Sequence, residues 1–361
     1  MAIKKIPSSH TAMVYDNPGQ ISIKRVNIST PQPEYGQVLV RLTHVGVCHS
    51  DHGIMTNAWA RYPRPTPVNQ IGGHEGVGHV VQLGHGIKKG QLSLKVGDRV
   101  GIKFVHDICR LCAACLSGAE SCCAEMEISG YFTPGCFQEY CVAPADYVTR
   151  IPDEVTSSLA APLLCAGLSA YSALKKSRAT PGSWIVILGA GGGVGHLMCQ
   201  IASRALGLRV IGVDVQEKGG LIKECGAEVF LALEQGDRMH AIYRQTEGLG
   251  AAAVLVCTGE DSAFTEAIEM LRFNGVAVVV GVQEGTERPI SSACPNAFLF
   301  KQTSIVGSSV GTYRESVEVM ELARRGILQP CVNLEPLENL QNVFERMEAG
   351  TLKGKVVLNI P

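Results

Sequence analysis

The sequence predicts an α/β protein in which a β-rich first part is followed by a doubly wound parallel sheet. Residues 1 to about 160 carry apolar runs such as QVLVRLTHVGV (37–47) and GVGHVVQLG (76–84), separated by glycine and proline. Further along, short apolar runs alternate with helical patterns, which indicates a parallel sheet covered by helices on both faces. The length of 361 residues is enough for two domains, each with its own core.

Five apolar runs predict the strands of the second part. They are WIVIL (184–188), RVIGV (209–213), AAVLVC (252–257), VAVVVG (276–281) and SIVGS (304–308). Near the end of the chain an amphipathic stretch, LQNVFERMEAG (340–350), precedes a strand-like run, KVVLNI (355–360). Continuously apolar strands of this length are typical of a sheet that is buried on both faces.

The composition is that of a globular protein without a basic excess. Hydrophobic residues make up 46% of the chain and charged residues 18%, with a formal net charge of −1, so we expect neither nucleic acid nor a membrane as a partner. The opening MAIKKIPSSHTAMVYD lacks the apolar core of a secretory signal, and we expect no apolar run to reach the length needed to span a bilayer. We therefore expect a cytoplasmic protein, whose fourteen cysteines are metal ligands or buried small side chains and not disulfides.

A glycine-rich turn precedes a helix in LGAGGGVGHLMCQIASRALGLRVIGVD (188–214). One apolar helical face follows the turn, made of Val194, Leu197, Met198, Ile201, Ala202, Ala205 and Leu206. At the start of such a helix, free N–H groups and the helix dipole favour a pyrophosphate, which glycines allow to approach the backbone. Asp214 ends the next strand, where a carboxylate can accept from a ribose 2′-hydroxyl and repels a 2′-phosphate.

This turn therefore predicts an NAD site rather than an NADP site. Its glycines do not match G-x-G-x-x-G cleanly, because they read either as Gly189, Gly191 and Gly195 with one extra residue or as Gly189, Gly192, Gly193 and Gly195. A tight turn that binds nothing is the alternative. The predicted cofactor contacts are Gly189, Gly192, Gly193, Val194, Gly195 and Asp214.

Four cysteines in CRLCAACLSGAESCC (109–123) have a spacing typical of structural zinc. Cys109, Cys112, Cys115 and Cys123 read C-x2-C-x2-C-x7-C, and four thiolates suit a tetrahedral zinc. A bacterial iron–sulfur run would place its fourth cysteine three residues on and follow it with proline, and a redox C-x-x-C would lie beside a thioredoxin-like βαβ unit. Unligated cysteines remain an alternative, and Cys122 is surplus. A zinc held by four cysteines has no open position, so we expect the chemistry elsewhere.

Three more candidate ligands are dispersed in GVCHSDHG (46–53), GGHEGVG (72–78) and PLLCAG (162–167). Each alone is more typical of a packed core residue. Together, two cysteines and one histidine are the zinc ligands already known from alcohol dehydrogenase, where they leave a fourth zinc position open. The agreement is therefore a match to a known example and not an independent derivation. The three residues are Cys48, His74 and Cys165.

With these motifs in this order, the sequence resembles the zinc-dependent medium-chain alcohol dehydrogenases, in particular their tetrameric microbial branch. The resemblance extends over nearly the whole chain. It rests on GVCHSD, GGHEGVG, GDRVGI, the four-cysteine loop, LLCAG, the glycine-rich turn, SIVGSSVG and GKVV. It implies a GroES-like catalytic domain (1–166 and 306–361), rejoined by the C-terminal strand and interrupted by a Rossmann NAD-binding domain (167–305), with the active site in the cleft between them. It also implies NAD, two zinc ions per chain and a homotetramer.

Position by position, the resemblance assigns roles around the metal. Asp51 matches the acid that orients the zinc-bound histidine, and Glu75 matches the acid beside the metal. Ser50 matches the hydroxyl that takes the alcohol proton. The ligands of the catalytic zinc become Cys48, His74 and Cys165.

The resemblance also assigns contacts to the cofactor and the substrate. His49 matches a contact to the cofactor phosphate, Lys355 aligns with a basic residue that contacts the pyrophosphate, and Lys218 lies near a ribose-contacting lysine. Exposed lysines are usually only solvated, which is the alternative for both. Trp59 and Phe104 match residues that line the substrate pocket, although both can be core aromatics. A phenyl ring at 104, where an indole is common, indicates room for a substrate larger than ethanol.

The sequence departs from the family in the proton relay. The family often has histidine five positions after the first zinc cysteine, where this chain has Gly53, and His52 lies one place earlier. Either His52 takes over the relay, or the proton leaves through the cofactor ribose and water.

The implied function is reversible hydride transfer between a primary or secondary alcohol and NAD, giving an aldehyde or ketone. Two alternatives stay open. One is a dehydrogenase or reductase of the same fold for a specialised alcohol, polyol or pathway intermediate. The other is an NAD-binding protein that has lost catalysis.

Overall fold

The computed structural model describes residues 5–87 and 94–361. Residues 1–4, part of the segment expected to lack a secretory signal, lie outside the described residues. The chain packs as two compact units, Met1–Cys165 with Thr312–Arg324 and Val332–Pro361, and Ala166–Gly311 with Arg325–Cys331. The domain boundaries given above stay a prediction.

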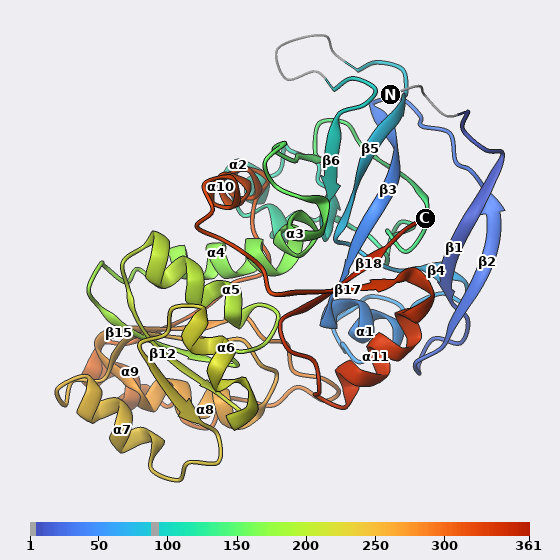
Figure 1. Ribbon diagram of the computed structural model, residues 1–361. Coiled ribbons are helices and arrows are strands. Elements are labelled where there is room, and N and C mark those ends of the chain that lie inside the picture. Colours follow the sequence, from blue (N-terminus) through green and yellow to red (C-terminus); the bar gives the residue numbers. More distant parts are fainter. Residues whose placement is uncertain (1–4, 88–93) are drawn as a thin grey trace. The chain divides into compact units, whose positions relative to one another are not determined.

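The first unit is built on a seven-stranded sheet, in the order β10-β6-β5-β3-β18-β17 with β9 also on β3, beside a three-stranded sheet β2-β1-β4 and the pair β7-β8. The C-terminal strand pairs antiparallel with β3, from Val356 opposite Val47 to Asn359 opposite His44, as the resemblance implies (Figure 1). The strands are β1 (Ser9–Tyr15), β2 (Ile23–Ser29), β3 (Gln37–Val47), β4 (Gln70–Ile71), β5 (Gly76–Leu83), β6 (Arg99–Ile102), β7 (Val105–Asp107), β8 (Glu127–Ile128), β9 (Tyr140–Pro144), β10 (Thr149–Arg150), β17 (Val332–Pro336) and β18 (Lys355–Asn359).

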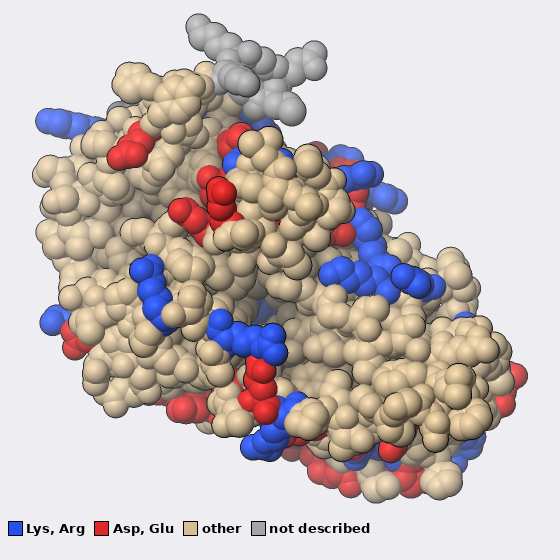
Figure 2. Space-filling view, turned by 180° about the vertical axis from the view of Figure 1, so that it is seen from behind, with Lys and Arg blue, Asp and Glu red and all other residues tan. Residues whose placement is uncertain are grey.

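All helices of this unit except α10 have fewer than ten residues. They are α1 (His49–Met55), α2 (Ala113–Leu116), η1 (Glu120–Cys122), α3 (Ser157–Pro162), α10 (Tyr313–Arg324), η5 (Leu337–Asn339) and α11 (Leu340–Glu348). Two of them matter for chemistry, because α1 begins directly after β3 and α2 lies inside the four-cysteine loop. On the face drawn in Figure 2, lysines and arginines lie beside acidic residues, in keeping with the near-zero net charge.

The second unit is a six-stranded parallel sheet in the order β13-β12-β11-β14-β15-β16. This is the order of a doubly wound dinucleotide-binding sheet, in which ligands bind at the carboxyl ends of the strands where the order reverses. That reversal lies between β11 and β14. The strands are β11 (Trp184–Leu188), β12 (Arg209–Asp214), β13 (Val229–Ala232), β14 (Ala251–Val256), β15 (Leu271–Val279) and β16 (Ser304–Gly307).

The helices of the second unit follow the strands. They are α4 (Leu168–Lys176), α5 (Gly195–Gln200), η3 (Ile201–Ala205), η4 (Gln216–Lys218), α6 (Gly219–Glu224), α7 (Arg238–Gln245), α8 (Asp261–Glu269) and α9 (Pro295–Lys301), while η2 (Leu163–Gly167) spans the boundary of the units. Val186, Ile211 and Val254 of three adjacent strands are fully buried in the core. The five predicted strands are therefore all present, and the sixth, β13, was missed.

One expectation about apolar length was wrong. The helical segment Ser157–Lys176 has 20 residues and a mean hydropathy of 1.3, so it passes the test of length and composition for a membrane span. However, 78% of its apolar window is buried inside the protein, and Leu163, Leu164 and Leu168 are fully buried. A buried core helix of a globular protein can have the same length and composition as a membrane span. This helix is therefore only weak evidence for a membrane span.

Candidate active site

A buried carboxylate organises the residues predicted to hold the catalytic metal. Asp51 lies in the first turn of α1 and is fully buried. Its Oδ2 accepts from the Cys48 N–H at 3.0 Å, and its Oδ1 accepts from the Gly73 N–H at 3.1 Å. The same Oδ1 lies 2.7 Å from Nδ1 of His74. Asp51 thus joins the start of α1 to the loop before β5 and fixes the orientation of the His74 ring.

The other ring nitrogen of His74 is free to bind a metal. Because the carboxylate accepts a hydrogen bond from Nδ1, the lone pair of the neutral ring is on Nε2, which is buried and has no hydrogen-bond partner in the described chain. Burial lowers the pKa of His74, but Asp51 outweighs this effect and raises it to about 10, so without a metal Nε2 carries a proton, which a bound metal ion would replace. The surroundings of this ring therefore favour a positive charge.

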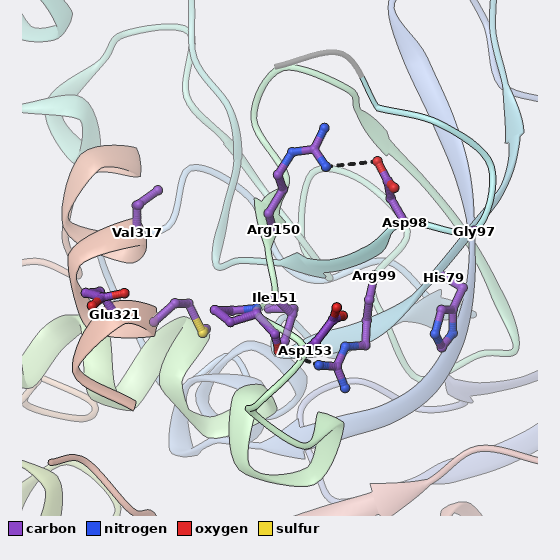
Figure 3. Close-up of a pocket in the computed structure, with 11 residues that line it drawn as sticks. His79, Gly97, Asp98, Arg99, Arg150, Ile151, Asp153, Val317 and Glu321 are labelled. Atoms are coloured by element: carbon purple, nitrogen blue, oxygen red, sulfur yellow. Dashed lines mark hydrogen bonds and ion pairs between the residues drawn. The ribbon is translucent and has the colours of Figure 1, made fainter. Parts of the chain in front are cut away.

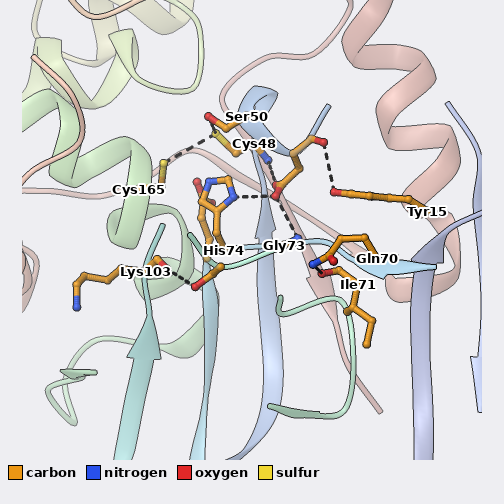
Figure 4. A network of polar contacts seen from close by, with 12 residues as sticks. Tyr15, Cys48, Ser50, Gln70, Ile71, Gly73, His74, Lys103 and Cys165 are labelled. Atoms are coloured by element: carbon orange, nitrogen blue, oxygen red, sulfur yellow. Dashed lines mark hydrogen bonds and ion pairs between the residues drawn. The ribbon is translucent and has the colours of Figure 1, made fainter. Parts of the chain in front are cut away.

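The two cysteines complete the ligand set (Figure 4). Sγ of Cys48 and Sγ of Cys165 lie 3.9 Å apart, close to the roughly 3.8 Å expected for two sulfurs bound at about 2.3 Å to one tetrahedral zinc. A hydrogen bond with Cys165 holds the pKa of Cys48 well below its usual range. Ligand atoms of four residues lie within 4.8 Å of one another, and the residues are Cys48, His74, Glu75 and Cys165. The donor set and its geometry fit zinc.

The acid next to His74 is held by a lysine from the far end of the chain. Glu75 is fully buried, and its Oε1 accepts from Lys355 Nζ at 2.7 Å, while its Oε2 has no partner in the described chain. Burial raises the pKa of Glu75 to about 7, although Lys355 opposes the shift. Gly46 leaves the space, because a Cβ there would lie 1.9 Å from Oε2. The contact of Lys355 with the cofactor pyrophosphate stays a prediction, and the structure places its Nζ on Glu75.

The four cysteines of the loop 109–123 form a second cluster. Sγ of Cys112 lies 3.6 Å from Sγ of Cys115, and Sγ of Cys123 lies 3.6 Å from Sγ of Cys109. All four sulfurs lie within 4.8 Å of one another, and all fourteen cysteines of the chain have free thiols. Backbone N–H groups also point at the sulfurs, from Cys112 to Cys109 at 3.3 Å and from Cys109 to Cys123 at 3.4 Å. This arrangement fits a structural zinc, and the exposed Cys122 is outside it.

The glycine-rich turn is held by the acid predicted to face the ribose. Oδ2 of Asp214 accepts from the Gly191 N–H at 2.8 Å, and Oδ1 lies 3.4 Å from Lys218 Nζ. A Cβ at Gly191 would lie 2.7 Å from Cβ of Lys218, a Cβ at Gly195 would lie 2.1 Å from the Gly189 oxygen, and Gly189 itself has φ +80°. The steric need for glycine therefore falls on Gly189, Gly191 and Gly195, which is the first of the two readings given above.

The comparisons with known proteins decide the family. Residues 34–153 match the family model of the alcohol dehydrogenase GroES-like domain, and residues 193–325 match that of zinc-binding dehydrogenases. The chain is 48% identical to alcohol dehydrogenase 2 of Emericella nidulans over 368 aligned positions that cover all of both proteins. The chain belongs to the zinc-dependent medium-chain alcohol dehydrogenases. The predicted fold class and the predicted enzyme class, an NAD-dependent zinc alcohol dehydrogenase, are confirmed.

Other relatives of this alcohol dehydrogenase agree. An alcohol dehydrogenase of Geobacillus stearothermophilus is 39% identical and covers 97% of this chain and 98% of its own. Among solved structures, the alcohol dehydrogenase of Aeropyrum pernix has a TM-score of 0.86 at 26% identity, with 97% of this chain and 100% of that chain covered. Acetophenone reductase from Geotrichum candidum, solved in complex with NAD, has a TM-score of 0.84 at 27% identity, with 99% of each chain covered.

The relay position of this alcohol dehydrogenase has a steric explanation. A Cβ at Gly53 would lie 2.6 Å from Nε1 of Trp59, so the indole takes the space of the histidine that the family often has there. His52 is buried, with its ring 5.4 Å from that of the exposed His49. Ser50 is half-buried, and its Oγ lies 3.7 Å from Sγ of Cys48. The roles of these residues in proton transfer and cofactor binding stay predictions.

Aromatic rings lie beside the predicted ligands. Phe104 is buried, and its ring meets that of His74 edge-on at 5.1 Å between centroids. Trp59 packs against Tyr62 at 5.3 Å, and Tyr62 stacks on Tyr131 at 4.5 Å. Tyr62 and Tyr131 were not predicted, since no spacing rule connects two tyrosines that are far apart in the chain.

The structure also contains a surface pocket of about 700 Å³ away from these residues (Figure 3). Its lining includes Arg99, Arg150 and Asp98. Arg150 donates to Asp98 at 2.9 Å, and Arg99 donates to the carbonyl of Pro152, so both arginines already have partners. None of the predicted site residues lines this pocket, and we assign no chemistry to it.

Proposed function

We propose that this chain catalyses reversible hydride transfer between a primary or secondary alcohol and NAD, giving an aldehyde or ketone, at a zinc site formed by Cys48, His74 and Cys165. The observation that carries the proposal is the buried, unpartnered Nε2 of His74 beside the sulfurs of the two cysteines. When bound, zinc supplies Lewis acidity toward the alcohol oxygen, and NAD supplies the hydride acceptor.

The residues of the chain have distinct tasks in this proposal. Asp51 keeps the hydrogen of His74 on Nδ1 and leaves Nε2 for the metal. Ser50 accepts the alcohol proton at Oγ, which places proton transfer beside Cys48. From there the proton leaves either by way of His52 or through the cofactor ribose and water. The glycine-rich turn and Asp214 bind the pyrophosphate and ribose of NAD.

A panel of primary, secondary, aromatic and polyol alcohols, assayed in parallel with NAD and NADP, tests this function. The proposal predicts alcohol-dependent NADH formation and a preference for NAD, because Asp214 repels a 2′-phosphate. NADH binding without turnover of any alcohol in the panel would support the inactive NAD-binding alternative. The complete ligand set and Ser50 favour an active enzyme.

We also propose two zinc ions per chain, one in each cysteine-containing cluster, and a cytoplasmic homotetramer without nucleic-acid or membrane partners. Support for subunit contacts comes from β16, which lies at the end of its sheet in the described chain, and from Leu299 and Phe300, which are 68% and 81% exposed. An edge strand beside exposed apolar side chains is a typical surface for pairing with a second copy. Light scattering of the purified protein tests the tetramer.

Replacing Asp51 by asparagine is expected to lower kcat/KM by about 10- to 100-fold, the usual cost of losing the partner of a metal-binding histidine. Asparagine has one accepting oxygen, so its amide nitrogen faces either the Cys48 N–H, which binds Oδ2 of Asp51, or Gly73 and His74, which bind Oδ1. In both orientations the negative charge beside His74 is lost. The zinc content and kcat/KM of the variant, measured together, check this. Full activity with normal zinc content would show that Asp51 has no orienting role.

Replacing Phe104 by tryptophan tests the size of the substrate site. The ring lies against His74, so a larger indole is expected to reduce the space for the substrate next to the metal. We expect kcat/KM for branched or aromatic alcohols to fall about tenfold relative to that for ethanol. An unchanged ratio between these substrates would place Phe104 outside the substrate site. A fall in the ratio would support the alternative of a specialised, larger alcohol.

A further inference from the structure

Three polar side chains on one helical face bind a distant stretch of backbone. Nε2 of His196 accepts from the Cys331 N–H at 3.1 Å, and Arg204 donates to the carbonyl of Ile327 at 3.5 Å. Between them, the Gln200 amide donates to the Gln329 carbonyl and accepts from the Gln329 N–H, both at 2.8 Å. The spacing of four residues places these side chains in one row along α5 and η3. The row therefore holds residues 327–331 against the helix that follows the glycine-rich turn.

His196 differs from the other two because it also binds that turn. Its Nδ1 lies 2.8 Å from the carbonyl oxygen of Gly192, and the side chain is fully buried. A carbonyl oxygen only accepts, so Nδ1 carries the hydrogen, and Nε2 is left to accept from Cys331. The ring is thus assigned as the neutral Nδ1–H tautomer, with both nitrogens used.

The contact with Gly192 sets the direction of the next N–H group. The Gly192 carbonyl and the Gly193 N–H belong to one planar trans peptide, so they point in opposite directions. Two peptides earlier, Asp214 holds the Gly191 N–H at 2.8 Å. The Gly193 N–H donates to no backbone carbonyl in the described part of the chain. The Gly192 carbonyl also accepts from the backbone N–H of His196 at 3.1 Å, so the ring adds a second, shorter hydrogen bond to a peptide between two residues that lack a Cβ.

We propose that His196 is a positioning residue for the dinucleotide, which turns the Gly193 N–H toward the pyrophosphate by holding the Gly192 carbonyl. This inference rests on the proposed binding of NAD at the turn. Without the ring, only the backbone N–H of residue 196 binds the Gly192 carbonyl, so the peptide of the two glycines is less firmly oriented and the Gly193 N–H is less well arranged for an anion before it binds.

Three substitutions at this position separate the two contacts of the ring. In His196→Asn the side-chain amide lies where Nδ1 lies, so it can donate to Gly192 but cannot reach Cys331. In His196→Gln the amide oxygen lies where Nε2 lies, so the side chain can accept from Cys331 but does not donate to Gly192. His196→Leu has neither contact. The two amide variants are therefore matched in chemistry and differ in which contact they keep.

NADH affinity by fluorescence titration, together with KM for NAD and kcat, is the measurement. We expect His196→Gln and His196→Leu to weaken NADH binding and raise KM for NAD by about five- to tenfold, the effect of one lost hydrogen bond. His196→Asn is expected to stay within about twofold of the natural chain, and kcat is expected to change less than KM in all three.

Gln200→Leu is the control, because it removes two contacts with Gln329 without touching the turn. It should lower the urea midpoint of unfolding and leave NADH affinity unchanged. The inference is overturned if all three His196 variants bind NADH like the natural chain, or if His196→Gln keeps the affinity that His196→Asn loses. If His196→Leu does not fold, the two amide variants still decide. Failure of the natural chain to bind NADH would instead overturn the proposed NAD site.

Discussion

His74→Ala is expected to lower kcat/KM for alcohol oxidation by at least about a thousandfold, because several kcal/mol of Lewis-acid stabilisation are lost and each 1.36 kcal/mol is about tenfold in rate. The substitution removes the buried Nε2 and leaves two sulfurs 3.9 Å apart without the third ligand. The dinucleotide turn is built from other residues, so NADH binding should remain measurable. Initial rates of NADH formation and a fluorescence titration with NADH check both halves of this prediction.

His79→Ala is the matched control for this experiment. His79 lies on β5, five residues after His74, and it is exposed and belongs to neither metal cluster. We expect this variant to keep its activity within about twofold, as most surface substitutions do. Full activity of the His74→Ala protein would contradict the assignment of the catalytic metal site. Equal losses in both variants would point to a general effect of substitution in or next to β5.

Cys112→Ser is expected to destabilise the chain before it affects catalysis. Loss of the four-cysteine site should lower the free energy of unfolding by about 3 kcal/mol or more, comparable with the removal of a disulfide. The loop also carries Glu120, whose Oε2 accepts from Tyr147 Oη at 2.6 Å and from the Tyr313 N–H at 2.7 Å. Loosening of the loop is therefore expected to weaken the start of α10 as well. Urea unfolding and zinc content per chain measure these effects.

Cys122→Ser is the control for the loop, since Cys122 is exposed and lies next to Cys123 without belonging to the cluster. It should leave both the zinc content and the unfolding midpoint unchanged. If Cys112→Ser also leaves the zinc-to-protein ratio unchanged, the loop does not hold a structural zinc. If both variants lose zinc, then the assignment of Cys122 as the surplus thiol is wrong.

The doubly wound sheet could be predicted because its signals are local. The run 184–188 coincides with β11, and the other four runs fall within one or a few residues of their strands. The strand β13 (Val229–Ala232) escaped prediction because it is a short edge strand whose side chains are mostly half-buried. Its apolar pattern is correspondingly weak. The segment Ser157–Lys176 shows the opposite case, in which composition alone does not distinguish a core helix from a membrane span.

The metal sites were predictable to different degrees. The four-cysteine loop is local, and its spacing indicates zinc without reference to any relative. Cys48, His74 and Cys165 are far apart in sequence, so only the resemblance to the family singled them out. The pairing of Glu75 with Lys355, 280 residues away, was not predicted, because it depends on β18 pairing with β3. The packing of Trp59 on Gly53 likewise required the structure.

The most direct test of the catalytic site is anomalous diffraction at the zinc absorption edge from crystals of the purified protein. We expect a zinc peak within about 2.0–2.3 Å of Cys48 Sγ, His74 Nε2 and Cys165 Sγ, and a second peak among the sulfurs of the four-cysteine loop. A peak in the loop alone, with none beside His74 in protein that oxidises alcohols, would contradict this expectation.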